Sequence, residues 1–364
     1  MKKVLLVNAA ILAAGLILLE LVFGSWFSDA SPLYSFIKPR NVHKTYQTPF
    51  PGQPDVSTYT IDEHGLRGLD KGLGDIFILT VGGSTTDQKY IDDNHTFEAL
   101  LQKSFKEDGR DVDIVSAGID GQSTYGHLKN FPYWFAKLPG FRPRYILYYV
   151  GVNDFYTLAE RQKFDAMERN GPMAKRILAY VREKSALYAT GRIAASLLSP
   201  PDVAHFKQGK PVAWSQDDWT TRAHTDGYRT PEVEVSLEQL HGRITRLADA
   251  TRKAGAVPIF VTQRSINWIE RDGVIWGLKS AAARRDADAL AGLGPLNGVD
   301  FYWLERMQAM AIMDACRKAK GVCIDLAGNI RIDHMGDFYD MVHTTPSGSR
   351  RIARFLYSRL KNLP

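Results

Sequence analysis

Residues 75–87 read Asp-Ile-Phe-Ile-Leu-Thr-Val-Gly-Gly-Ser-Thr-Thr-Asp, and they decide the fold that the sequence predicts. The first half is a short apolar run rich in β-favouring residues, which indicates a strand buried on both faces. Gly82 and Gly83 then allow a tight turn, and three hydroxyl residues follow it. Because α/β sheets bind ligands at this carboxyl edge, Ser84 is a candidate nucleophile. The alternative is that Ser84 only caps the next helix.

Strand-like runs alternate with helical patterns through most of the remaining chain. The other apolar runs lie at 112–117, 145–150, 257–262 and 322–326. Apolar residues at helical spacing occur at 96–105, 237–253, 302–318 and near the C-terminus. This alternation predicts an α/β fold with a central parallel sheet of about five strands between layers of helices. The intervals 155–230 and 264–300 break the pattern, and we interpret them as insertions that shape a substrate cleft.

The N-terminus carries a membrane signal. Lys2 and Lys3 precede an apolar run at 4–23, which is long enough to cross a bilayer as a helix. We interpret residues 1–25 as an uncleaved, single-pass anchor in the inner membrane. The positive-inside rule then places the rest of the chain in the periplasm of a bacterium. A cleaved signal peptide is the alternative, with 28–30 as the tolerable cleavage site.

Composition and residue pattern limit the remaining organisation. The chain has 364 residues, of which 45% are hydrophobic, and this is enough for one large domain with a full core. Its net charge of +6 arises from basic residues mixed with 40 acidic ones, so no nucleic-acid partner is expected. We expect residues 26–74 to form an extended stalk that packs on the domain, and residues 75–364 to form the domain itself.

Three further loops bring chemical groups to the edge of the sheet where Ser84 lies. The second strand ends at 116–124, the third at 149–154, and the loop at 338–348 precedes the last helix. Acyl transfer by serine requires an imidazole base, a carboxylate that orients it, and donors for the oxyanion. His343 is the candidate base, and Asp340, three residues earlier, can reach its ring nitrogen.

These four blocks resemble, in order and separation, those of the SGNH (GDSL-like) hydrolase superfamily, and especially its membrane-anchored bacterial members. The first block has glycine at position 83 where the family usually has aspartate, a variant common in anchored members. The resemblance implies a three-layer, flavodoxin-like sandwich and a serine hydrolase activity. It also implies a catalytic triad of Ser84, His343 and Asp340.

The resemblance also implies an oxyanion hole. Its donors would be the backbone amides of Ser84 and Gly121 and the side chain of Asn153. Gly118 is close enough in sequence to be an alternative to Gly121. Taken alone, Asn153 could equally cap a turn, as Asp340 could cap a helix.

The function that follows from this resemblance is a serine esterase of the carbohydrate O-acetyl esterase type. Its substrate would be an acylated cell-envelope or secreted glycan, and polysaccharide biosynthesis or export proteins would be its partners. Neither a cofactor nor a metal is expected, because the histidines lack ligand spacing and no phosphate-binding loop is present. The alternatives are a glycan O-acetyltransferase with the same triad, a non-catalytic envelope-assembly module, and a lipid-acting esterase.

Two features stay open at this stage. Cys316 and Cys323 are the only cysteines, and they either pair in an oxidising compartment or stay as separate thiols. The aromatic group Tyr133, Trp134 and Phe135 either stacks on sugars or packs a helix against the sheet.

Overall fold

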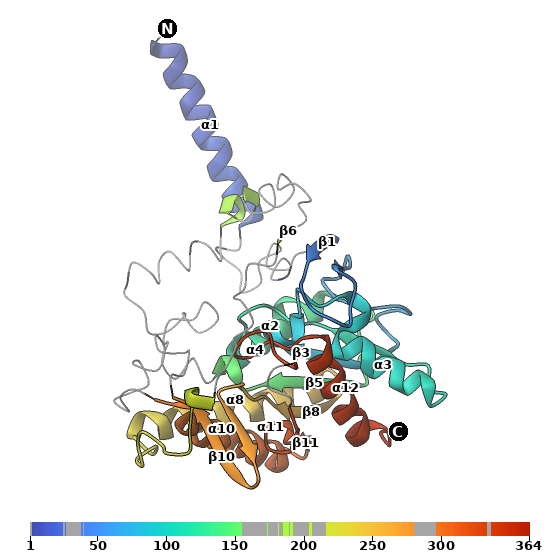
Figure 1. The fold of residues 1–364 in the computed structure, drawn as a ribbon. Helices are drawn as coiled ribbons and strands as arrows, with labels where there is room; N and C mark the ends of the chain where they lie inside the picture. The colour runs from blue at the N-terminus through green and yellow to red at the C-terminus, as the bar shows by residue number, and fades with distance from the viewer. Residues whose placement is uncertain are drawn as a thin grey trace.

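The computed structural model describes residues 2–24, 26, 38, 40–154, 216–279, 296–332 and 336–364, together with a few residues between 173 and 205. These residues form an α/β domain, from which a long N-terminal helix projects (Figure 1). Most of the predicted insertion at 155–230, and part of the one at 264–300, lie outside the described residues.

The centre of the domain is a five-stranded parallel sheet with the order β11-β8-β5-β3-β4. Its strands are β3 (Ile76–Gly82), β4 (Asp113–Ser116), β5 (Tyr145–Val150), β8 (Val257–Thr262) and β11 (Val322–Ile324). Each overlaps one of the predicted strand runs, so the predicted sheet is confirmed. The strand order reverses between β3 and β5, as in flavodoxin-like sheets, and this is where such sheets place their ligands.

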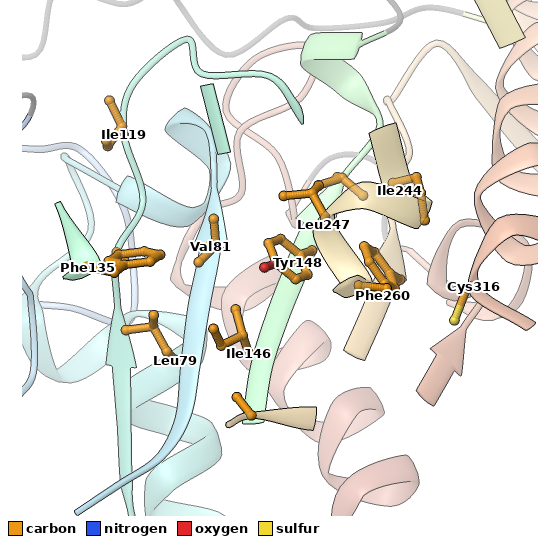
Figure 2. Packing of buried hydrophobic residues seen from close by; sticks show 14 of the residues in the cluster. Leu79, Val81, Ile119, Phe135, Ile146, Tyr148, Ile244, Leu247, Phe260 and Cys316 are labelled. Carbon is orange, nitrogen blue, oxygen red and sulfur yellow. The ribbon is translucent and has the colours of Figure 1, made fainter. Parts of the chain in front are cut away.

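Helices cover both faces of this sheet and complete a three-layer sandwich. One face carries α3 (Phe97–Glu107) and α12 (Pro346–Leu360), and the other carries α4 (Thr124–Tyr133), α8 (Pro231–Lys253) and α10 (Gly298–Lys318). Strand β5 contributes side chains to the hydrophobic cores on both faces of the sheet, because its side chains alternate between the faces. Tyr148 packs with Leu247 and Phe260 on the α8 side, as Figure 2 shows, whereas Leu147 packs with Leu356 on the α12 side.

The described residues also contain smaller elements. A hairpin of β1 (Val42–Gln47) and β2 (Val56–Ile61) precedes the domain, and β6 (Ala204–His205) pairs with β1. A second small sheet contains β7 (Trp219–Thr220), β10 (Val274–Leu278) and β9 (Trp268–Arg271). The short helical turns are α2 (Ser84–Asp87), η2 (Asp93–His95), η3 (Phe135–Lys137), η4 (Gln216–Asp218) and α11 (Leu326–Asn329).

The N-terminal helix α1 (Lys2–Phe23) matches the predicted apolar run. With a mean hydropathy of 2.4 over its most apolar window, it is apolar enough to span a membrane or to serve as a signal sequence. Its one acidic residue, Glu20, lies near the end that faces the domain. There the carboxylate accepts hydrogen bonds from Trp26 Nε1 at 2.8 Å and from the Ala186 amide at 3.0 Å.

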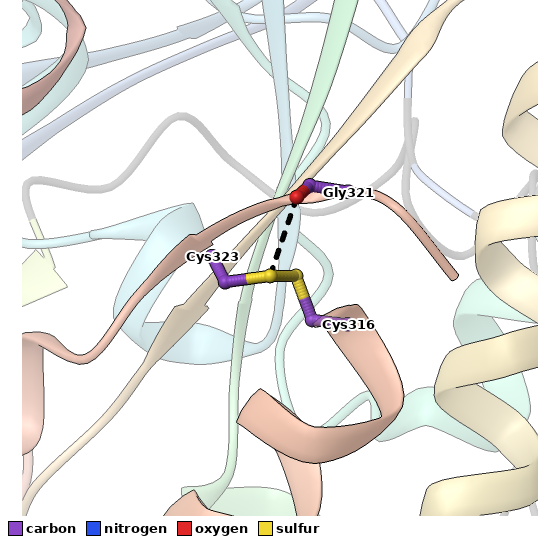
Figure 3. Close-up of a disulfide and its surroundings, with 3 residues drawn as sticks. All are labelled: Cys316, Gly321 and Cys323. Carbon is purple, nitrogen blue, oxygen red and sulfur yellow. Dashed lines mark hydrogen bonds between the residues drawn. A yellow bond between two sulfur atoms is a disulfide. The ribbon is translucent and has the colours of Figure 1, made fainter. Parts of the chain in front are cut away.

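A disulfide joins Cys316, near the end of α10, to Cys323 in β11, with the two α-carbons 5.9 Å apart (Figure 3). Of the two alternatives that the sequence left open, the structure therefore contains the paired one. The bond ties the edge strand of the central sheet to the helix that covers it.

Candidate active site

The turn after β3 places Ser84 at the carboxyl edge of the sheet. Ser84 is the first residue of α2, and the turn is closed by the Asp87 amide, which donates to the Gly83 carbonyl at 2.9 Å. Gly82 is required here because a β-carbon would overlap Thr86 Oγ1 and would lie 3.0 Å from the Tyr149 carbonyl oxygen. The sequence therefore forms the sharp exit that exposes the serine hydroxyl.

The loop before α12 holds His343 through Asp340. Asp340 Oδ1 accepts hydrogen bonds from the amides of Val342 at 2.9 Å and His343 at 2.8 Å, and Oδ2 lies 2.7 Å from His343 Nδ1. Thr345 caps α12 by accepting from the Gly348 amide, so the last helix begins within the stretch 338–348. The carboxylate thus fixes both the loop and the imidazole.

The structure brings Ser84, His343 and Asp340 together in one hydrogen-bonded chain. His343 Nε2 lies 2.7 Å from Ser84 Oγ, across a sequence separation of 259 residues. Burial alone would raise the pKa of Asp340, but the hydrogen bond and charge interaction with His343 outweigh it, and the net pKa is lowered. An ionised carboxylate only accepts hydrogen bonds, so the imidazole proton resides on Nδ1 and the Nε2 lone pair faces the serine hydroxyl.

Asn153 lies directly beside the turn that contains Gly83 and Ser84. Its Nδ2 donates to the Gln122 carbonyl at 2.9 Å, and it occupies the space that a β-carbon on Gly83 would need. Asn153 follows β5 while Ser84 follows β3, so the two adjacent strand ends meet at the reversal of the sheet. The side-chain donor that the sequence predicted is therefore next to Ser84.

The two candidate glycines differ in their hydrogen bonding. The Gly118 amide donates to Ser116 Oγ at 3.3 Å, and a β-carbon on Gly118 would overlap the Asp87 backbone. Gly121 adopts a positive φ of 74° in the turn before Gln122. Within the described part of the chain, its amide makes no hydrogen bond. Gly121 therefore has a backbone donor available for a ligand, and Gly118 does not.

Several solved structures are similar to this chain. TesA matches with a TM-score of 0.41 and 15% identity, covering 79% of this chain and 99% of its own. An acetyl-xylooligosaccharide esterase from Geobacillus matches with a TM-score of 0.40 and 11% identity over 78% of this chain and 93% of its own. A member of the lipolytic G-D-S-L family from Veillonella parvula matches with a TM-score of 0.40 and 12% identity, covering 79% of this chain and 98% of its own. No family model and no curated protein matches the sequence.

Sequence reasoning missed a fourth strand end that contacts the site. Gln263 follows β8 and donates from Nε2 to Thr85 Oγ1 at 2.6 Å, and its Oε1 accepts from the Val152 amide at 2.9 Å. Three residues later, the Ile266 amide donates to the Met341 carbonyl at 2.9 Å. Gln263 therefore supports the turn that contains Ser84, and Ile266, at the start of the predicted 264–300 insertion, supports the loop that contains His343.

An aromatic stack beside His343 was also missed. The rings of Tyr339 and His343 are stacked, with their centroids 5.6 Å apart. The ring of Phe50 is stacked on that of Tyr339, with their centroids 4.8 Å apart. Burial, and then the charge of Asp340, raise the pKa of Tyr339, so its ring is neutral. The stack limits rotation of the imidazole without adding a charge beside it.

The structure also bears on the aromatic group that contains Trp134 and on the question of a metal site. Trp134 is 1% exposed and donates from Nε1 to the His64 carbonyl at 2.8 Å, so it packs the fold and is closed to sugars. Among the described residues, no group of three histidine, cysteine, aspartate or glutamate side chains is placed to hold a metal ion. His334, one of the scattered histidines, lies outside the described residues.

Proposed function

We propose that the chain is an SGNH-type serine esterase with Ser84, His343 and Asp340 as its catalytic triad. One observation carries the proposal: two 2.7 Å hydrogen bonds link Asp340, His343 and Ser84 Oγ in series. This is the arrangement that activates a serine hydroxyl, because the imidazole can take its proton while the carboxylate stabilises the resulting imidazolium.

The reaction follows from these positions. His343 Nε2 removes the Ser84 hydroxyl proton as Oγ attacks the ester carbonyl carbon, and the same proton is then given to the leaving alcohol. Water, deprotonated by the same nitrogen, attacks the acyl-serine and releases the carboxylic acid and the free serine. Asp340 keeps the imidazole in the required tautomer throughout both steps.

The developing negative charge needs donors on the other side of the carbonyl. We propose the backbone amides of Ser84 and Gly121 and the side chain of Asn153 for this role. Support comes from the place of Asn153 beside Gly83 and from the Gly121 amide, which makes no hydrogen bond to any described residue. Donors fixed in advance by the fold stabilise an oxyanion more effectively than water, which must reorient.

The substrate class is proposed from the resemblance of the four sequence blocks to anchored SGNH members. A small acyl group such as acetyl, on an envelope or secreted glycan, is the substrate that this resemblance favours. Transfer of the acyl group to a sugar hydroxyl uses the same acyl-serine, so the acceptor alone distinguishes an esterase from a transferase.

We further propose that α1 is an uncleaved inner-membrane anchor and that the domain lies in the periplasm. Lys2 and Lys3 begin α1 and precede its apolar run, and the Cys316–Cys323 disulfide is typical of an oxidising compartment. A reporter that is active only in the periplasm should be active when fused after Pro364. Mature protein whose N-terminus is Ser31 would instead identify a signal peptide.

A fluorophosphonate reagent tests the catalytic proposal directly. The full chain in detergent should be labelled once, at Ser84, and should hydrolyse 4-nitrophenyl acetate. His343→Ala should abolish both reactions, and Asp340→Asn should weaken them more mildly. His241→Ala is the matched control, because His241 also pairs with a carboxylate, Asp314 at 3.1 Å, but on helices α8 and α10.

Each outcome of this experiment has a distinct meaning. Labelling of Ser84 without hydrolysis of the acetate would identify a transferase that needs a sugar acceptor. A folded wild-type chain that is neither labelled nor active would contradict the proposal and favour a non-catalytic module. Equal losses in His241→Ala and His343→Ala would show that the imidazole effect is unrelated to the site.

A further inference from the structure

Three residues from the segment before the α/β domain converge on Asp87, the last residue of α2. Lys38 Nζ lies 2.9 Å from Asp87 Oδ1, and Tyr59 Oη donates to the same oxygen at 2.8 Å. Arg67 Nη1 donates to the Asp87 backbone carbonyl at 2.8 Å. The Lys38 and Asp87 side chains are only 4% and 6% exposed. The short helix that begins with Ser84 is therefore held at its far end by the N-terminal segment.

Lys38 also contacts the loop that carries the proposed backbone donor. Its Nζ donates to the Gly118 carbonyl at 2.5 Å, and Gly118 lies three residues before Gly121 in the same loop. One buried ammonium thus joins the nucleophile helix to the loop of the oxyanion hole. The backbones of Gly118 and Asp87 are in close contact, because a β-carbon on Gly118 would overlap the Asp87 amide nitrogen.

Movement of Asp87 would be transmitted to Ser84 through the helix backbone. The Asp87 amide donates to the Gly83 carbonyl at 2.9 Å, and the Gln88 amide donates to the Ser84 carbonyl at 2.9 Å. With only four residues, α2 has no other turn to absorb a displacement. A shift at its C-terminal end therefore changes the direction of the serine side chain.

Stability is a weak explanation for this ion pair. Removing two charges from water costs free energy that their attraction returns only in part, so a buried pair of this kind seldom adds net stability. Such pairs are better suited to fixing one geometry among several, because both partners must be satisfied together. The convergence of Lys38, Tyr59 and Arg67 on one residue fits that role.

The same segment also contacts the histidine side of the site. Phe50, in the loop between β1 and β2, stacks on Tyr339, which stacks on His343. The segment from residue 38 to residue 67 therefore reaches both reacting partners, the nucleophile through Asp87 and the base through Tyr339.

We propose that Lys38 is a positioning residue of the active site, which holds the Ser84 helix in register with the oxyanion loop. The inference rests on the proposed esterase function. Lys38 acts through Asp87 and Gly118 and has no role in binding the ester. Loss of its ammonium should therefore lower kcat while leaving KM nearly unchanged.

Lys38→Met tests this in the full-length chain in detergent, since methionine keeps the length of the side chain without the charge. With 4-nitrophenyl acetate, kcat should fall about 10- to 100-fold, the scale expected when reacting groups are misplaced by about 1 Å. KM should stay within about three-fold, because the perturbation changes positioning and not ground-state binding. Lys71→Met is the matched control, because Lys71 pairs with Asp111 at 2.8 Å on the exposed surface.

A second variant separates positioning from charge compensation. Lys38→Met leaves the Asp87 carboxylate buried without its cation, so it should also lower the melting temperature. In Lys38→Met with Asp87→Asn, the melting temperature should recover but kcat should stay low, because nothing then bridges Asp87 to Gly118. Recovery of both would show that Lys38 only neutralises Asp87, and would overturn the proposal.

Hydrogen exchange gives a readout that is independent of catalysis. In Lys38→Met the amides of residues 84–91 should exchange faster than in the wild type, and in Lys71→Met they should not. Unchanged exchange and unchanged kcat in a folded Lys38→Met chain would refute the positioning role. A wild-type chain without activity or labelling would refute the proposed function, while hydrogen exchange would still report whether Lys38 holds the helix.

Discussion

Gly83→Ala should disable the proposed oxyanion hole by displacing Asn153. Gly83 has a negative φ of −88°, so alanine would not be placed in the left-handed region there. The obstacle is space, because a β-carbon there would overlap Asn153 Nδ2 and would lie 3.0 Å from the Gln122 carbonyl oxygen. The Gln122 carbonyl belongs to the backbone, so the Asn153 side chain is the group that must move.

The size of the effect follows from what Asn153 would lose. Moving its amide away from Gly83 breaks the 2.9 Å hydrogen bond to Gln122 and removes one donor from the oxyanion. Loss of one such donor lowers kcat by about 10² to 10³, or about 2.7 to 4 kcal/mol of transition-state stabilisation. Gly83→Ala should therefore match Asn153→Ala. The double variant should lose little more than either single one, because both remove the same interaction.

Steady-state hydrolysis of 4-nitrophenyl acetate gives kcat for the three variants, and thermal unfolding reports whether each is folded. Gly242→Ala is the matched control, because a β-carbon there, within α8, meets no described atom within 4 Å. Its kcat should equal that of the wild type. A Gly83→Ala chain that keeps more than a third of the wild-type kcat, while Asn153→Ala loses 10², would refute the steric reasoning. The steric reasoning would also be refuted if the double variant lost kcat by the product of the two single losses.

Burial raises the pKa of Glu98 to about 7, although hydrogen bonds from Thr80 and Gln88 oppose the shift. The unfolded chain loses this proton above about pH 4.5, whereas the folded chain keeps it up to about pH 7. The free energy of unfolding should therefore fall as the pH rises from about 4.5 to about 7. In Glu98→Gln the melting temperature should not show that fall. Cys316→Ser should lower the free energy of unfolding by about 2 to 3 kcal/mol, as loop closure over this short separation predicts, and urea titration measures it. Phe50→Leu should lower kcat several-fold at unchanged KM, by removing the ring that supports Tyr339 and thereby His343.

The sheet could be predicted because its signals are local, and so could the proximity of Ser84, Asp340 and His343, the proposed triad. A buried parallel strand is a short apolar run, and five such runs gave all five strands of the central sheet. The spacing of Asp340 and His343 is local too, since three residues are enough for a carboxylate to reach the ring of a histidine in a tight loop. Ser84 lies at the carboxyl edge because it follows a strand, and the loop that contains His343 reaches the same edge.

The supporting residues could not be predicted because their partners lie far away in sequence. Gln263 contacts Thr85 across 178 residues, and nothing in its neighbourhood distinguishes it from any polar residue after a strand. Lys38 lies 49 residues before Asp87, in a stretch without helical or strand periodicity. Contacts of this kind depend on how the helices, strands and loops pack in three dimensions, and the spacing of residues along the sequence does not predict that packing.

The same contacts bear on where the functional unit begins. A fragment that started at residue 75 would keep every member of the triad, yet it would bury the Asp87 carboxylate without Lys38 or Tyr59. It would also leave the α2 backbone without Arg67, which donates to the carbonyls of Asp87, Gln88 and Ile91. An uncompensated charge in the interior is costly. Lys38, Tyr59 and Arg67 therefore belong to the scaffold of the proposed active site.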